Sequence, residues 1–217
     1  MVSFFERLKV ETQKEREELL KVVLINRALK GEMSLKTYVN YLTQAYHHVK
    51  HTTPLLMLTG SKIPESKEYL RDAMAEYIEE ELGHQEWVLN DIANCGFDKE
   101  GARKSKPNRA TDLMTAYAYD YVNRKNPVGF FGMVFVLEGT SINLATKAAQ
   151  TIMKSLDLKE ECFSYLLSHG SLDVGHMDFF EKLVNKIEDK NDQEAIIDMA
   201  KTMFYLFAEM FNSVEIE

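Results

Sequence analysis

The stretch ALKGEMSLKTYVNYLTQAYHHVKH, residues 28–51, decides the fold because it holds both the end of one helix and the start of the next. Residues 30–34, KGEMS, interrupt the helical pattern that runs from about Ser3 to Lys30, and Ser34 is a residue type that caps helix N-termini. Pro54 is expected to kink the aromatic-rich helix that follows, because proline cannot donate the helical hydrogen bond. The stretch predicts successive helices joined by a short turn.

The rest of the chain carries the same signal. Ten glycines and four prolines punctuate 217 residues, and no sustained alternating run indicates a sheet. The sequence predicts an all-α bundle of about seven or eight helices in one domain, residues 1–217. Further helices are expected from near Pro64 to a cap at Gly96, over 109–124 and over 127–155. Shorter helices that include 168–180 follow, and the last helix begins after a capping box at Asn191 and Glu194. The longest loop is expected over 97–108.

Composition and charge exclude several classes of protein. Hydrophobic residues make up 45% and charged residues 28%, which is typical of a globular protein, and 34 acidic against 26 basic side chains give a charge of −8 that disfavours nucleic acid. The first residues lack the apolar core of a signal peptide, and the apolar run 128–139 is interrupted by Glu138, so no membrane span is expected. Cys95 and Cys162 indicate no disulfide framework, which suits the cytoplasm.

Metal-binding side chains recur in the stretch SHGSLDVGHMDFF, residues 168–180. His169, Asp173 and His176 stand at offsets of zero, four and seven, which places them on one stripe of a helix. Gly170 weakens the helix there, and a chain break at that residue would remove His169 from the stripe. Capping and hydrogen-bonded surface residues are the alternative interpretation. The stripe predicts half of a metal site.

A second pattern lies in EYIEEELGHQEW, residues 76–87. Glu81 and His84 are three residues apart, so on a helix they project from one face and can bind one ion. Glu80, four residues before the histidine, competes for the same role. An exposed acidic helix face that precedes a histidine is the alternative interpretation, and one Glu-x-x-His pattern alone is a weak signal.

Glu138 is the third signal, because it follows an apolar run and is expected to point into the core or a cavity. A buried carboxylate must be paired, protonated or bound to metal, although a solvent-facing position or a buried Arg or Lys would also satisfy it. His47 and His51 lie one turn apart and can contact a substrate beside Tyr46, with packing as the alternative. The three patterns around residues 81–84, 138 and 169–176 together offer three imidazoles and three carboxylates. This set suits dinuclear iron better than a closed zinc site.

The stretch 28–51 resembles the heme-oxygenase-like superfamily, whose members share a short glycine turn before an aromatic-rich helix with a Tyr-Leu-x-Gln core. The order of helices is similar over most of the chain. The resemblance is sharper to the diiron oxidases and oxygenases of this superfamily. It implies a TenA-like bundle with metal ligands at the six matching positions: Glu81, His84, Glu138, His169, Asp173 and His176.

The sequence departs from that pattern on one helix. Many members separate the first glutamate and histidine by six residues, which would place the carboxylate at Tyr77. Tyr77 and Glu80 are therefore candidate pocket residues beside Tyr46, His47 and His51, and a further carboxylate ligand stays open.

The resemblance implies an enzyme that binds two Fe²⁺ ions, or a Mn/Fe pair, and uses O₂ to oxidise a small organic substrate, expected to carry a carboxylate. Glu138 and His84 are the candidate catalytic residues. An external electron donor and a homo-oligomer are expected partners, and nucleic acid and membrane are not.

Other branches and functions stay as alternatives. A TenA-type thiaminase needs a cysteine that 133–143 lacks, and heme oxygenase needs a histidine that 7–19 lacks. A ferritin-like diiron bundle, a metal-independent enzyme of the TenA or pyrroloquinoline quinone synthase type, and a protein that only binds a heterocycle such as a thiamin-related molecule remain.

Overall fold

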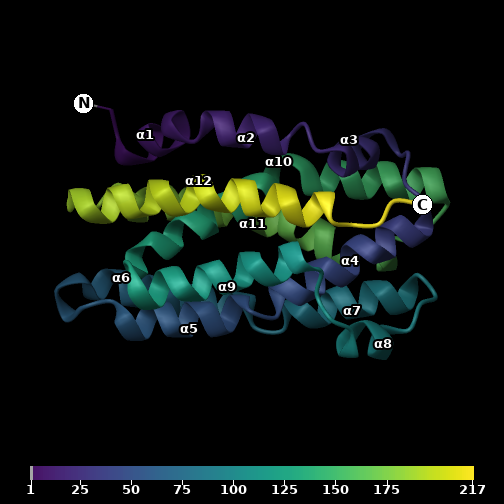
Figure 1. Cartoon of the computed structure of the whole chain (residues 1–217), viewed down its shortest axis with the longest axis horizontal. Coiled ribbons are helices and arrows are strands. Elements are labelled where there is room, and N and C mark those ends of the chain that lie inside the picture. Colours follow the sequence, from purple (N-terminus) through teal and green to yellow (C-terminus); the bar gives the residue numbers. More distant parts are fainter. Residues whose placement is uncertain (1) are drawn as a thin grey trace.

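The computed structural model describes residues 2–217, without the side chains of residues 170–175. Within these residues the regular elements are twelve α-helices and three short 3-10 helices, which is more than the seven or eight helices that the sequence predicts. The fold class is all-α, and the helices run mostly along the long axis of the molecule (Figure 1). The buried hydrophobic side chains form one cluster, from Phe4 to Val214.

The extra helices come from short breaks that periodicity does not detect. The predicted helix from Ser3 to Lys30 is three helices: α1 (Phe4–Glu11), α2 (Gln13–Leu19) and α3 (Val23–Lys30). At the first break, the Thr12 hydroxyl donates to the Leu8 carbonyl at 2.7 Å. Gly31 then closes α3 in the left-handed conformation, with φ of +72°.

The deciding stretch folds as α4 (Leu35–Val49), followed by α5 (Thr52–Lys62). Ser34 caps α4 as predicted, since its side chain accepts a hydrogen bond from the Thr37 amide at 3.0 Å. Pro54 lies in the first turn of α5, where a missing amide hydrogen is tolerated. The bend expected at Pro54 is therefore a helix break at Lys50 and His51.

The middle of the chain holds shorter elements. These are η1 (Glu65–Lys67), α6 (Glu68–Glu81), α7 (His84–Asn94), α8 (Lys99–Lys104) and α9 (Arg109–Arg124). The predicted loop 97–108 contains α8, because Asp98 caps a short polar helix by accepting from the Glu100 amide. Polar helices of this length lack the apolar periodicity that sequence patterns rely on.

Three long helices and two short ones complete the chain. They are η2 (Pro127–Gly129), α10 (Phe130–Leu156), η3 (Glu160–Cys162), α11 (Ser164–Val184) and α12 (Lys190–Asn212). The N-cap of α12 is Asp189, which accepts from the Asn191 and Asp192 amides, rather than the predicted Asn191. α10 packs against α3, α11 and α12, and α12 also packs against α9.

α10 is the central helix of the bundle. The segment Pro127–Leu156 has the length and mean hydropathy (1.5) of a membrane span, although the apolar run 128–139 alone is expected to be too short. However, 61% of its most apolar window is buried inside the protein. At Gly132 the backbone of α12 approaches so closely that an added Cβ would lie 2.7 Å from the Ala200 nitrogen. α10 therefore behaves as a core helix that holds Glu138 inside the bundle.

Candidate metal centre

Glu81 and His84 flank a helix break instead of sharing one helix. Glu81 is the last residue of α6, Leu82 is extended, Gly83 is left-handed with φ of +91°, and His84 begins α7. The break still brings the two side chains together, with Oε2 of Glu81 3.0 Å from Nδ1 of His84. Glycine suits this junction because other residues rarely adopt such a positive φ.

The surroundings of Glu81 favour its ionised form. Burial acts to raise the pKa of Glu81, but the hydrogen bond and charge of His84, with the charges of His169 and His176, outweigh it and lower the pKa. An ionised carboxylate is the form that binds a cation. Because all three histidines act on it, Glu81 lies within electrostatic reach of both groups of ligands described below.

His169 of α11 completes the first group, which comprises Glu81, His84 and His169. One ligand atom from each lies within 4.8 Å of the others, and His84 is only 2% exposed. Nδ1 of His169 donates to the Tyr165 carbonyl at 2.9 Å, which fixes the tautomer whose lone pair is on Nε2. Trp87 stacks on His84 at 3.9 Å between ring centroids. The first group is thus oriented for one ion.

His176, two turns along α11 from His169, centres a second group. Its Nε2 lies 3.0 Å from Oε2 of Glu80, and its Nδ1 lies 3.7 Å from Oε1 of Glu138. Glu138 and His176 are each 8% exposed, whereas the Glu80 side chain is 43% exposed. Consecutive carboxylates, Glu80 and Glu81, therefore face different histidines. The sixth predicted ligand, Asp173, lies outside the residues whose side chains are described.

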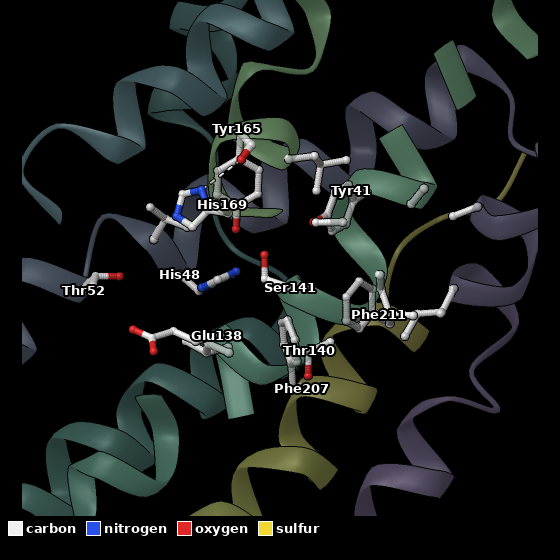
Figure 2. A pocket seen from close by; sticks show the side chains of 18 of the residues that line it. Tyr41, His48, Thr52, Glu138, Thr140, Ser141, Tyr165, His169, Phe207 and Phe211 are labelled. Carbon is white, nitrogen blue, oxygen red and sulfur yellow. Dashed lines mark hydrogen bonds between the residues drawn. The ribbon is translucent and has the colours of Figure 1, made fainter. Parts of the chain in front are cut away.

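A cavity of about 150 Å³ opens beside these groups, lined by residues of α3, α4, α5, α6, α10, α11 and α12. Its wall is mostly apolar, and Glu81, Glu138 and His169 belong to it. Figure 2 shows Glu138 and His169 toward one side of the cavity, with Tyr41 and Phe211 toward the other. The cavity therefore joins candidate metal ligands to an apolar chamber, the usual setting for binding a small organic molecule.

The candidate pocket residues divide into two sets. Tyr77 lines the cavity, and burial raises the pKa of its phenol well above the ordinary value. Tyr46, His47 and His51 are not among the described residues of the cavity wall. Nε2 of His47 lies 2.8 Å from Oγ of Ser105, and Nδ1 of His51 lies 3.1 Å from the Tyr119 hydroxyl.

His48 lines the cavity in place of its neighbours. On α4, Tyr41, Ala45 and His48 follow the spacing of one helix face, and His47 lies on another face of the same helix. Tyr41 and His48 belong to the cavity wall, as does Thr52 at the start of the following helix, α5. That spacing is a sequence signal that could have found His48.

Asp91 of α7 is a residue that the sequence analysis did not single out. It is fully buried, and its carboxylate accepts hydrogen bonds from the Ser164 amide at 3.0 Å, the Tyr165 amide at 2.9 Å and the Ser164 hydroxyl. Burial raises the pKa of Asp91, and these hydrogen bonds oppose the shift. Asp91 therefore caps α11 from α7 and sets the position of His169 relative to His84.

Asp91→Asn is expected to lower the free energy of unfolding by about 2 kcal/mol, because the amide nitrogen cannot accept and leaves a buried amide hydrogen unpaired. Urea unfolding of the metal-free protein measures the change. Asp98→Asn is the matched control, since Asp98 caps the exposed end of α8 and asparagine caps as well as aspartate. Equal changes in the free energy of unfolding of both variants would contradict the role of Asp91 in capping α11 from α7.

The donor set fits iron. The described ligands are imidazole nitrogens and carboxylate oxygens, and both cysteines lie outside the described wall of the cavity. Such mixed ligation is used by oxygen-activating non-heme iron, whereas structural zinc favours closed sites that often include cysteine. A heme does not fit the N-terminal helices, since α1, α2 and α3 contain no histidine.

Solved structures share the fold. A domain of unknown function with a heme oxygenase-like fold from Shewanella denitrificans is 24% identical, with a TM-score of 0.88 over 97% of this chain and 91% of that one. A TenA homolog from Pseudomonas syringae pv. tomato is 10% identical, with a TM-score of 0.79 over 97% and 92%. Heme oxygenase-1 from the cyanobacterium Synechocystis, in complex with heme, is 13% identical, with a TM-score of 0.76 over 99% and 93%. The predicted heme-oxygenase-like fold is confirmed.

The family is narrower than the fold. Residues 39–208 match the family described as iron-containing redox enzyme. The chain belongs to this family, and the expectation of an iron-dependent enzyme is confirmed at that level. No curated protein matches the sequence.

Proposed function

We propose that this protein is a non-heme diiron oxidase or oxygenase that uses O₂ to oxidise a small organic substrate. The observation that carries the proposal is the presence of two histidine–carboxylate groups, around His84 and around His176, beside one apolar cavity. Two separate groups can hold two ions, and the cavity can hold the molecule to be oxidised.

Each side chain has a defined task in this proposal. His84, His169 and Glu81 would hold one ion, and His176, Glu80 and Glu138 the other, with Asp173 added as the resemblance implies. The bound ferrous ions would supply electrons to O₂ at their open positions. Four carboxylates, Glu80, Glu81, Glu138 and Asp173, balance the four positive charges of two Fe²⁺ ions. The same donors accept Mn²⁺, so metal analysis distinguishes a Mn/Fe pair.

The chain's own contribution is orientation and exclusion of water. Glu138 and His84 hold their donor atoms in buried positions, and the mostly apolar cavity wall keeps solvent from the reacting groups. A carboxylate on the substrate would have to bind at the metal ions. Where the substrate is oxidised by only two electrons, the other two electrons that O₂ takes up must come from an external donor, which we propose as a partner.

Anaerobic titration of chelator-stripped protein with Fe²⁺ tests the proposal. We expect two ions per chain, followed by a transient visible absorption band when O₂ is mixed in. Uptake of one ion would contradict the dinuclear site, and no uptake would contradict a metal-dependent function altogether. In that case the metal-independent enzyme or the heterocycle-binding protein of the same fold becomes the better hypothesis.

A further inference from the structure

One polar side chain in the cavity wall has no role in the metal centre. His48 is 5% exposed, and its Nδ1 is buried without a hydrogen-bond partner among the described residues. Burial lowers the pKa of His48 to about 3, with smaller contributions from the charges of His169 and His51, so the ring is neutral at physiological pH. A buried polar atom without a partner costs free energy, which indicates that something else satisfies it.

Ser141 repeats this pattern on a different helix. It lies three residues after Glu138 on α10 and lines the cavity, and its hydroxyl oxygen is also buried without a hydrogen-bond partner among the described residues. Figure 2 shows His48 and Ser141 in the middle of the cavity, between Glu138 and His169 on one side and Tyr41 and Phe211 on the other. Two unsatisfied polar groups from α4 and α10 thus lie in the cavity wall next to the candidate ligands Glu138 and His169.

The charge of the cavity wall limits which groups it can bind. Neither the described residues of its wall nor the sequence of residues 170–175 includes lysine or arginine. A second anionic group placed away from the metal ions would therefore be buried without a counter-charge, which is very unfavourable. The neutral His48 ring and Ser141 hydroxyl can satisfy an uncharged group without that penalty.

We propose that His48 and Ser141 form a binding subsite for one uncharged hydrogen-bonding group, a hydroxyl or carbonyl, on the apolar part of the substrate. This inference rests on the proposed function, in which the cavity holds the substrate beside the metal ions. A cavity of about 150 Å³ is comparable to one that binds a single aromatic ring, so the occupant is a molecule of about that size. The subsite fixes which part of the substrate faces Glu138 and His169.

Two probes of equal shape test the subsite. p-Cresol and p-xylene differ by one hydroxyl in place of a methyl group, and titration calorimetry under nitrogen gives both affinities in the Fe²⁺-loaded full chain. We expect p-cresol to bind at least as tightly as p-xylene, although a purely apolar cavity would favour p-xylene. His48→Leu is expected to weaken p-cresol about tenfold and to leave p-xylene within about threefold, and Ser141→Ala to act in the same direction.

The control is His51→Leu, which changes a histidine on the adjoining turn that faces Tyr119 and not the cavity, and should leave both affinities unchanged. Retained p-xylene binding shows that a variant keeps its cavity. An unchanged ratio of affinities in His48→Leu would overturn the proposal and would mean that His48 and Ser141 hold only ordered water. Failure of both probes to bind would overturn it as well.

The same measurement on chelator-treated protein separates this inference from the proposed function. The ratio of p-cresol to p-xylene affinity depends on the cavity wall and does not require iron. A normal ratio with no iron uptake would contradict the diiron proposal alone, and two bound irons with an unchanged ratio in His48→Leu would contradict the subsite alone.

Discussion

Alanine in place of His84 is expected to reduce iron uptake from two ions per chain to one. The side chain is 2% exposed and lies 3.0 Å from Glu81, so its loss removes one of two imidazoles from the first group and leaves the group around His176 in place. Removing a residue that only orients a metal ligand lowers metal affinity or activity by about 10–100-fold. Removing the ligand itself should therefore lower the metal affinity by a larger factor. Metal analysis after anaerobic loading and the rate of O₂ consumption measure both effects.

His176→Ala provides the complementary half of this experiment. We expect it also to bind one ion, and the double variant with His84→Ala to bind none. His51→Ala is the control, because His51 is half-buried and hydrogen-bonds to Tyr119, and it should retain two ions. Full metal content in both single variants would mean that the two groups are structural ion pairs.

Gly132→Ala is expected to destabilise the fold by more than about 3 kcal/mol. The new Cβ would overlap the Ile196 carbonyl and would lie 2.7 Å from the Ala200 nitrogen and 2.9 Å from Cβ of Met199. Because two of these atoms belong to the α12 backbone, the clash can be relieved only by moving α10 and α12 apart. Urea unfolding of the metal-free chain measures the change.

Gly139→Ala is the matched control for that substitution. It lies on the same helix two turns later, and its Cβ would meet only Cε of Met177, at an ordinary 3.6 Å. Alanine is favoured over glycine inside a helix, so a gain of about 0.5–1 kcal/mol is expected. A similar change in the two variants would show that the contact between α10 and α12 does not limit stability.

Much of the fold could be predicted from the sequence because the signals are local. Ser34 is a capping residue before an apolar periodic segment, and α9 occupies the predicted range 109–124. The breaks at Thr12 and at Leu82–Gly83 could not be predicted, because they interrupt the helical pattern for one or two residues only. A short polar helix such as α8, with six residues, also lacks any periodic signal.

In the candidate metal centre, too, only the features with a local sequence signal could be predicted. Spacing along one helix is enough to place His169 and His176 on one stripe, and an apolar run is enough to expect Glu138 inside the bundle. Contacts between elements distant in sequence could not be predicted. Glu80 pairs with His176, nearly a hundred residues later, only because the tertiary fold brings the end of α6 near α11. The cap that Asp91 provides for α11 is hidden for the same reason.

The chain contains a single tryptophan, and that indole is the ring stacked on His84. All tryptophan fluorescence of the protein therefore originates beside one of the two groups of ligands. An emission change follows events at His84 and His169, whose rings lie 3.9 Å and 6.0 Å from Trp87, without a signal from a second indole. The protein thus carries a built-in optical reporter that can reveal the order in which the two halves of the centre are filled.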